Sequence, residues 1–107
     1  MSDKDKPVYL VANLAVKDLE DFIQRYGAGV MPQLQKAGAE ILAAAQPQLL
    51  EGNQGINRTV LIRFPNADIA NNWYSSEEYQ PLKNLRINEL TTSGSAVFVE
   101  AFDPDAT

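Results

Sequence analysis

The sequence predicts an α+β domain in which helices cover one face of a four-stranded antiparallel sheet. Two observations point to this fold class. Apolar residues alternate in some segments and recur every three to four positions in others. These segments follow one another in the order strand, helix, strand, strand, helix, strand, which is the split βαβ arrangement of ferredoxin-like sandwiches.

The first half of the chain predicts a strand and a helix. The strand spans residues 7–16, which begin with proline and continue with β-branched and aromatic residues. Asp18 is placed to cap a helix, because apolar residues then recur at helical offsets. Pro32 lacks a backbone donor, so we expect a kink or a break near Met31. Gly38 is expected to end this helix.

The middle of the chain predicts a hairpin. Residues 39–45 are expected to form the second strand, although their alanines also suit a helix. The turn-forming residues 52–55 precede a clear strand over residues 58–64. The two strands are therefore expected to pair.

The last part predicts a helix and a final strand. Asn66 is placed to cap a short helix, and Ser75 and Glu78 have the spacing of a capping box for a second helical segment. Residues 93–95, Ser-Gly-Ser, are expected to form a turn, and residues 96–102 the last strand.

Composition and charge exclude several kinds of mechanism. Of 107 residues, 45% are hydrophobic and 21% charged, which is typical of a folded protein. The net charge of −5 at pH 7 gives no basic surface for nucleic acid. Histidine and cysteine are absent from the sequence, so we expect no metal site, no cofactor and no histidine-dependent nucleophile.

The organisation of the chain predicts one domain. We expect a flexible segment at residues 1–6, a single domain over residues 7–103 and a short tail at residues 104–107. No apolar run reaches the roughly 18 residues that a membrane helix needs, and the charged N-terminus lacks a signal-peptide pattern. We therefore expect a cytoplasmic protein that does not bind membranes.

Alternation along the strands predicts two different sheet faces. A purely apolar set is assigned to the helix side: Val8, Leu10, Ala12, Leu14, Val60, Ile62, Phe64, Val97, Val99 and Ala101. The other set mixes apolar and polar residues: Tyr9, Val11, Asn13, Ala15, Leu61, Arg63, Phe98, Glu100 and Phe102. This second face is too apolar to lie in water over so small a sheet. We therefore expect a homodimer that packs two such faces together around a partly polar cavity.

A candidate site follows from this assignment. If the first strand lies antiparallel between the third and the last, Tyr9, Arg63 and Glu100 share one end of the second face. A guanidinium and a carboxylate beside a phenol could orient a polar ligand. The alternative is a partly buried ion pair that satisfies itself.

One stretch resembles a known family. The residues are Arg63-Phe64-Pro65-Asn66, Ala70, Trp73-Tyr74, Ser75, Glu78-Tyr79, Leu82 and Arg86, supported by Tyr9, Phe22, Tyr26, Glu51-Gly52, Arg58 and Phe102. They resemble the bacterial family called domain of unknown function 1330, within the dimeric α/β barrel superfamily, over about residues 7–103. The resemblance implies a ferredoxin-like sandwich and a homodimer, with no established reaction. Members often carry an arginine and a glycine pair where this chain has Ala43 to Pro47, so no ligand role is carried over there.

Further candidate residues each have a structural alternative. Arg86 could bind a ligand carboxylate or phosphate, or form a salt bridge with Glu78 or Glu89. Trp73 and Tyr79 could form an aromatic wall for a planar ligand, or simply belong to the core. Asn13, with Trp73 and an arginine, supplies the residue types that cofactor-free monooxygenases of this fold use to hold an aromatic substrate.

Two functions therefore remain open. The first is a homodimeric small-molecule-binding domain with a pocket on the sheet face near Tyr9, Arg63, Glu100 and Arg86. The second is a cofactor-independent monooxygenase or isomerase acting on a small anionic or aromatic substrate. An isomerase would need a raised pKa at Glu100, because an ordinary glutamate, with a pKa of about 4.3, is a weak base at neutral pH. A dimer whose cavity is filled by side chains is a third possibility.

Overall fold

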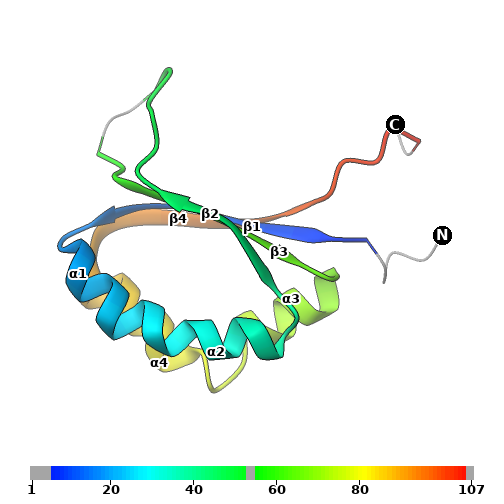
Figure 1. Cartoon of the computed structure of the whole chain (residues 1–107), viewed down its shortest axis with the longest axis horizontal. Helices are drawn as coiled ribbons and strands as arrows, with labels where there is room; N and C mark the ends of the chain where they lie inside the picture. The colour runs from blue at the N-terminus through cyan, green and yellow to red at the C-terminus, as the bar shows by residue number, and fades with distance from the viewer. Residues whose placement is uncertain (1–5, 53–54, 106–107) are drawn as a thin grey trace.

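All the helices of the described chain lie on one side of a four-stranded antiparallel sheet (Figure 1). The computed structural model describes residues 6–52 and 55–105. Residues 1–5 of the expected flexible segment and residues 106–107 of the expected tail lie outside this range. The strands are β1 (Val8–Val16), β2 (Glu40–Ala45), β3 (Arg58–Phe64) and β4 (Thr91–Glu100), arranged in the order β2-β3-β1-β4. This confirms the predicted α+β sandwich, with β1 antiparallel to both of its neighbours.

The helical layer has two parts, one after β1 and one after β3. The first comprises α1 (Leu19–Phe22), η2 (Ile23–Gly27) and α2 (Ala28–Lys36), and the second comprises α3 (Ala67–Tyr74), α4 (Gln80–Leu85) and η3 (Arg86–Leu90). Among the helices of the described residues, none is both long and apolar enough to cross a membrane.

Local side-chain chemistry starts and ends these helices as predicted. The Asp18 carboxylate accepts a hydrogen bond from the backbone N–H of Asp21 at 3.0 Å. The Asn66 side chain caps α3 in the same way, accepting from the N–H three residues ahead. Gly38 has φ +74 and follows the C-terminal end of α2, where the N–H of Ala39 donates to the carbonyl of Leu34 at 2.9 Å. A glycine at this position adopts the left-handed conformation without a steric penalty.

The expected break near Met31 is absent. Helix α2 continues through Pro32, and the irregular segment is the π-helical η2 before it. Pro32 and Ala28 are both exposed, so water can bind the carbonyl that the proline leaves without a backbone donor. The position of the irregularity was therefore predicted wrongly.

The cap before α4 comes from a different serine than expected. The Ser76 hydroxyl accepts from the N–H of Tyr79 at 3.2 Å, whereas the Ser75 hydroxyl donates to the carbonyl of Asn71 at 2.8 Å. Ser75 therefore caps the C-terminal end of α3, and Ser76 provides the cap before α4.

The last strand is longer than predicted and begins before the expected turn. Residues 93–95 lie within β4, where Gly94 pairs with Leu14 of β1. A Cβ at Gly94 would lie 2.8 Å from the Leu14 Cδ2 atom. The glycine thus permits a close approach of two strands and does not make a turn.

The face assignment of β4 was also wrong. Leu10 pairs with Phe98 and Tyr9 with Val99, so Phe98 and Glu100 lie on the helix side while Val97 and Val99 lie on the opposite face. The large ring of Phe98 packs against Phe64, with ring centroids 5.9 Å apart. The core takes the larger aromatic surface, and the smaller valines remain outside, 52% and 49% exposed.

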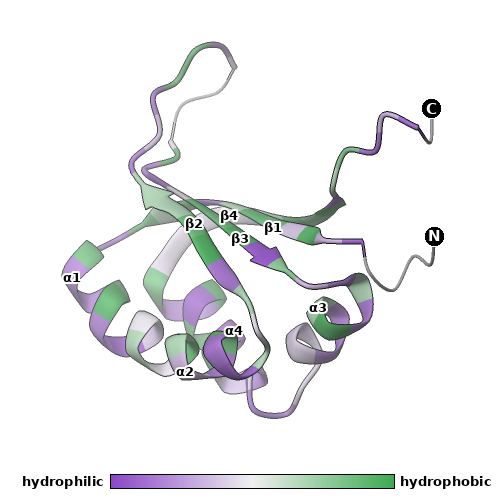
Figure 2. Cartoon of the chain, turned by 45° about the vertical axis from the view of Figure 1, so that its right-hand side comes forward, coloured by the Kyte–Doolittle hydropathy of each residue, from purple (hydrophilic) through white to green (hydrophobic). Residues whose placement is uncertain are grey.

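The core lies between the sheet and the helices, as predicted for β1 and β3. Its main cluster comprises Val8, Leu10, Val30, Leu34, Ile62, Phe64, Ala70, Trp73 and Tyr79. Figure 2 shows apolar residues gathered along the strands, while the helices alternate between apolar and polar residues. We call the sheet face away from the helices the open face.

Candidate functional site

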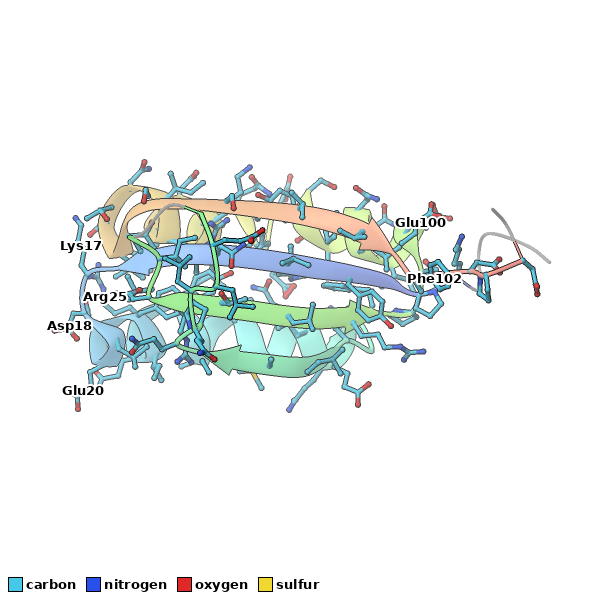
Figure 3. The ribbon with its side chains drawn as sticks, turned by 90° about the horizontal axis from the view of Figure 1, so that it is seen from above. Lys17, Asp18, Glu20, Arg25, Glu100 and Phe102 are labelled. Atoms are coloured by element: carbon cyan, nitrogen blue, oxygen red, sulfur yellow. The ribbon has the colours of Figure 1, made fainter. Side chains whose placement is uncertain are left out.

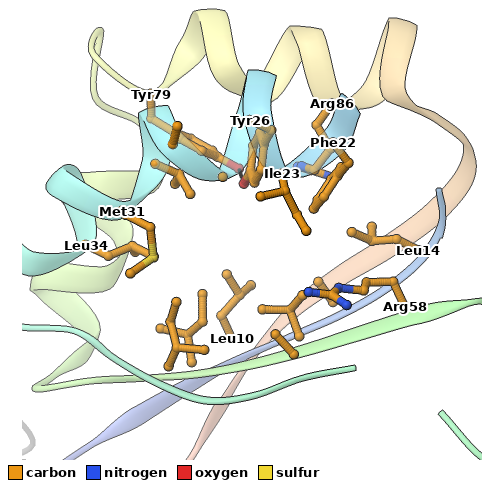
Figure 4. Close-up of a pocket in the computed structure, with 18 of the residues that line it drawn as sticks. Leu10, Leu14, Phe22, Ile23, Tyr26, Met31, Leu34, Arg58, Tyr79 and Arg86 are labelled. Atoms are coloured by element: carbon orange, nitrogen blue, oxygen red, sulfur yellow. Dashed lines mark hydrogen bonds between the residues drawn. The ribbon is translucent and has the colours of Figure 1, made fainter. Parts of the chain in front are cut away.

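A cavity of about 430 Å³ lies between the helices and the sheet (Figure 4). Inward-facing residues of β1, β2 and β3, such as Leu10 and Ile62, form its floor, and residues of the helical layer, such as Val30 and Leu34, form its roof. Most of this lining is apolar. A second, more open hollow of about 520 Å³ is lined by Asn13, residues 46–51, Gly55 and Ile56.

Polar side chains enter the first cavity from both of its sides. The Tyr26 and Tyr79 hydroxyl oxygens are 2.6 Å apart and form a hydrogen bond. Arg86 is 7% exposed and lies beside them. Figure 4 shows these three side chains on the helix side of the cavity and Arg58 on the sheet side. We call Tyr26, Tyr79, Arg86 and Arg58 the polar group of the cavity.

Both π-helical segments contribute to this polar group. Tyr26 lies within η2, and Arg86 is the first residue of η3. A π-helical segment changes the direction of the side chains that follow it, and such segments occur often at functional sites. The sequence pattern predicts regular helices at both places and does not reveal these two segments.

The arginines of the chain fall into two classes. The exposed ones have carboxylate partners: Arg25 contacts Asp21 and Glu89, and Arg63 lies 4.0 Å from Glu40. Within residues 6–52 and 55–105, neither cavity arginine forms an ion pair, and no acidic residue lines the cavity.

Arg86 interacts with the hydroxyls of Tyr79 and Tyr26, whereas Arg58 keeps an unpaired donor. The Nε atom of Arg58 is buried and has no hydrogen-bond partner. The predicted structural partner of Arg86, Glu89, binds Arg25 at 2.9 Å instead. A buried charge without a counterion is costly in the protein alone, so the polar group has unused capacity to bind an anion.

The polar group carries a positive charge at neutral pH. Burial alone would lower the pKa of the Arg86 guanidinium, but its interactions with Tyr79 and Tyr26 outweigh burial, and the pKa is raised. Burial, followed by the effect of Tyr79, raises the pKa of Tyr26 well above its ordinary value of 10.0. The cavity therefore holds a permanent cation beside the neutral phenol of Tyr26.

The open face holds three of the predicted site residues. Tyr9 and Arg63 are cross-strand partners there, as predicted. Asn13 lies further along β1, where its side-chain oxygen accepts a hydrogen bond from the Thr59 hydroxyl at 2.7 Å. This bond gives Asn13 a structural partner within the sheet.

Glu100 does not lie on the open face with Tyr9 and Arg63. It lies on the helix side, opposite Val8, at the same end of the sheet as Phe102 (Figure 3), and its carboxylate is 3.2 Å from the Lys6 amine. The expectation that Tyr9, Arg63 and Glu100 share one face is wrong, because the register of β4 on β1 turns Glu100 to the other side.

The other predicted site residues lie inside the domain. Trp73, Tyr79 and Arg86 all line the cavity. The Trp73 ring packs on Tyr79 with centroids 4.2 Å apart, and its indole N–H donates to Gln33 at 3.1 Å. The predicted site thus divides into two groups on opposite faces of the sheet.

Two members of the polar group were not among the predicted ligand residues. Tyr26 was assigned to the apolar stripe of the first helix, and Arg58 was noted only for its place in the family pattern. The signal that could have found Arg58 is strand parity, because it shares the inward face with Leu14, its partner on β1.

Comparisons with known proteins place the chain in a family without an assigned function. The model of the family described as domain of unknown function (DUF1330) matches residues 7–102. No curated protein gives a significant match.

Solved structures share the fold at low sequence identity. A protein of unknown function from Rhodopseudomonas palustris has a TM-score of 0.76 and 11% identity, covering 94% of this chain and 85% of that chain. A dimeric protein of unknown function with a ferredoxin-like fold from Bacteroides fragilis has a TM-score of 0.58 and 14% identity, covering 89% and 96%. A putative antibiotic biosynthesis monooxygenase from Nitrosomonas europaea has a TM-score of 0.63 and 10% identity, covering 97% of each chain. The structural similarities extend only to the ferredoxin-like fold, whereas the match over residues 7–102 shows that the chain belongs to the DUF1330 family.

Proposed function

We propose that the protein is a homodimeric small-molecule-binding domain whose ligand occupies the cavity between the helices and the sheet. One observation carries the proposal: a cavity of about 430 Å³ with apolar walls contains the polar group, whose arginines have no carboxylate partner among the described residues. Protein interiors are close-packed and pair their buried charges. A bound ligand would account for both the empty space and the buried arginines without a counterion.

The volume of the cavity also fits this role. Small-molecule sites usually occupy about 300–1,000 Å³ and combine apolar walls with a few polar groups. Three of the predicted site residues, Trp73, Tyr79 and Arg86, line this cavity, which supports it over the open face as the pocket.

Two adjacent alanines of β2 test where the ligand binds. Ala44 pairs with Val60 and lines the cavity, whereas Ala43 pairs with Leu61 on the open face. Compounds found by mass spectrometry of the native protein, or by a thermal-shift screen, should raise the melting temperature of the wild type. The same compounds should raise the melting temperature of Ala43→Phe. They should have little effect on the melting temperature of Ala44→Phe, because its added ring points into the cavity. Equal stabilisation of both variants would place the ligand elsewhere.

We propose that the homodimer forms through the open face. Val97 and Val99 are about half exposed there, in the same sheet rows as Tyr9 and Val11. The described parts of the β2–β3 loop and the segment after β4 rise on this side of the sheet (Figure 1). A second copy would cover these apolar residues, and a structural neighbour is described as dimeric.

A cofactor-independent monooxygenase is the second candidate function. The polar group favours it, because a fixed guanidinium beside phenol hydroxyls can stabilise a developing anion. The sequence has no histidine, and no carboxylate of residues 6–52 and 55–105 lines the cavity, so the substrate would need to arrive already ionised. Glu100 cannot serve as the base here, because it is largely exposed and pairs with Lys6.

Oxygen uptake separates the enzyme from the binding domain. The purified protein would be mixed with ionised phenols and 1,3-diketones in an oxygen electrode. Uptake that disappears in Arg86→Met would establish the oxygenase. A protein that binds these compounds without consuming oxygen would be a binding domain for them.

A further inference from the structure

We infer that the ligand is an amphipathic monocarboxylate, with its carboxylate held between Arg86 and Arg58 and its apolar body against the remaining cavity walls. This inference rests on the proposed function, because it assumes that the cavity binds a small molecule. It adds the chemical class of the ligand and its orientation.

The charge of the cavity is opposite to that of the chain. The whole chain has a net charge of −5 at pH 7, yet the charged residues of its described part that line the cavity are Arg58 and Arg86. Arg58 comes from the sheet and Arg86 from the helical layer, so the two guanidinium groups enter from opposite walls (Figure 4). An anionic group between them would gain a charged partner on either side.

The hydrogen-bond inventory of the polar group favours an acceptor. Guanidinium groups only donate, and the Arg58 Nε–H has no acceptor. Tyr26 and Tyr79 share one hydrogen bond, which uses the hydrogen of one hydroxyl and leaves that of the other available to a ligand. Donors therefore outnumber acceptors at this end of the cavity, as a carboxylate requires.

The geometry of the helices favours a carboxylate over a phosphate. Phosphate sites commonly use backbone N–H groups at a helix N-terminus. Tyr26 and Arg86 instead belong to segments that continue directly from preceding helices, so their backbone N–H groups are engaged along the helix. The polar group offers side-chain donors only.

The rest of the cavity fits an apolar body. Leu10, Val30 and Ile62 are buried members of the core that also line it. Met31 of α2 and Ile41 of β2 line it as well and are exposed, so the opening between these two elements is apolar. A small inorganic anion would leave all of this surface without contact.

Matched pairs of carboxylates and amides test the inference. The probes are 4-phenylbutyrate and octanoate, their primary amides, and inorganic phosphate, titrated calorimetrically into the full chain at pH 7.5 and constant ionic strength. Each carboxylate should bind at least about tenfold more tightly than its amide, because hydrogen bonds to charged groups contribute more than neutral ones. Inorganic phosphate should neither bind nor compete.

Three arginine variants locate the carboxylate. Arg86→Met and Arg58→Met should each weaken carboxylate binding about 10- to 100-fold, the range expected for a charge-assisted hydrogen bond. The affinity for the amides should change less than about threefold. Arg63→Met, on the open face, should leave both affinities unchanged. Circular dichroism establishes that each variant is folded.

The outcomes separate the inference from the proposed function. Amides that bind as tightly as carboxylates, or phosphate that competes equally well, would overturn the monocarboxylate and leave a small-molecule site in place. A loss of carboxylate binding in Arg63→Met alone would move the anion to the open face and also overturn it. If no compound of any charge binds, the proposed function itself fails.

Discussion

At the scale of single residues, Arg86 is a buried charge whose partners are tyrosines and not a carboxylate. Its side chain is buried in an apolar cavity without a carboxylate partner among the described residues. Under the proposed function this charge serves the ligand, and its contacts with Tyr79 and Tyr26 offset the desolvation cost in the free protein.

Arg86→Met should leave the ligand-free protein about as stable as the wild type, because it removes the desolvation cost of the guanidinium together with its contacts to Tyr79 and Tyr26. Replacing buried ionic groups by apolar ones is often neutral or stabilising by about 1–4 kcal/mol. Urea unfolding of the ligand-free protein measures the free energy. A loss of more than about 1 kcal/mol, the net worth of one ordinary hydrogen bond, would instead give Arg86 a structural role through its contacts with Tyr26 and Tyr79.

The buried hydroxyl of Tyr26 should make the free energy of unfolding fall at alkaline pH. Burial raises the pKa of its hydroxyl in the folded state above the ordinary value of 10.0. The folded protein therefore retains this proton where the unfolded chain releases it. The contribution of Tyr26 is fully present below pH 10 and is lost as the pH rises further, by up to about 1.4 kcal/mol per pH unit.

Tyr26→Phe tests this dependence. The variant should lose about 0.5–1.5 kcal/mol at pH 8 with its hydrogen bond to Tyr79, and should lose less stability than the wild type between pH 10 and pH 11. Urea unfolding at pH 8, 10, 10.5 and 11 measures both effects. Parallel pH profiles of the two proteins would show that the Tyr26 hydroxyl does not control alkaline stability.

At the scale of the elements, three caps follow from neighbouring residues, whereas helix irregularities, strand ends and the cap before α4 do not. Asp18, Asn66 and Gly38 were predicted correctly, because each acts on backbone groups a few positions away. The π-helical segments and the start of β4 were not predicted, because they depend on packing between separate elements.

Gly94→Ala should destabilise the protein through the contact between β1 and β4. The added Cβ would lie 2.8 Å from Leu14 Cδ2 and 3.2 Å from the Asn13 carbonyl oxygen. Overpacking of this kind typically costs about 1–3 kcal/mol, measurable by chemical unfolding. Ser95→Ala, at an exposed neighbouring position of the same strand, is the control and should change stability by less than about 0.5 kcal/mol. Equal stability of the two variants would remove this explanation for the glycine.

At the scale of the whole molecule, the two faces of the sheet differ in how far they are covered. The helices cover one face and enclose the cavity, while the open face keeps Val97 52% exposed and ends beside Phe102, which is 82% exposed. This distribution is expected of a protomer that associates with a second copy.

If the proposed homodimer forms through the open face, Val97→Lys should convert it to a monomer. Lysine tolerates the half-exposed position in a single chain but would be buried against a like charge at a two-fold interface. Light scattering after size-exclusion chromatography gives the mass, with Asn72→Lys on the exposed surface of α3 as the control. The wild type should also melt at a temperature that rises with protein concentration. A monomeric wild type would overturn the dimer and leave the cavity unaffected.

The α+β class, the order of the elements, the main caps and the apolar character of both sheet faces were accessible from the amino-acid pattern. These features rest on periodicity and on hydrogen bonds between residues close in the chain. The side of the sheet that Glu100 occupies, and the meeting of Tyr26, Tyr79, Arg58 and Arg86 around one cavity, were not. They depend on the register of β4 against β1, including its shift between Ala15 and Val16, and on contacts between residues far apart in the chain, such as the hydrogen bond from Tyr26 to Tyr79.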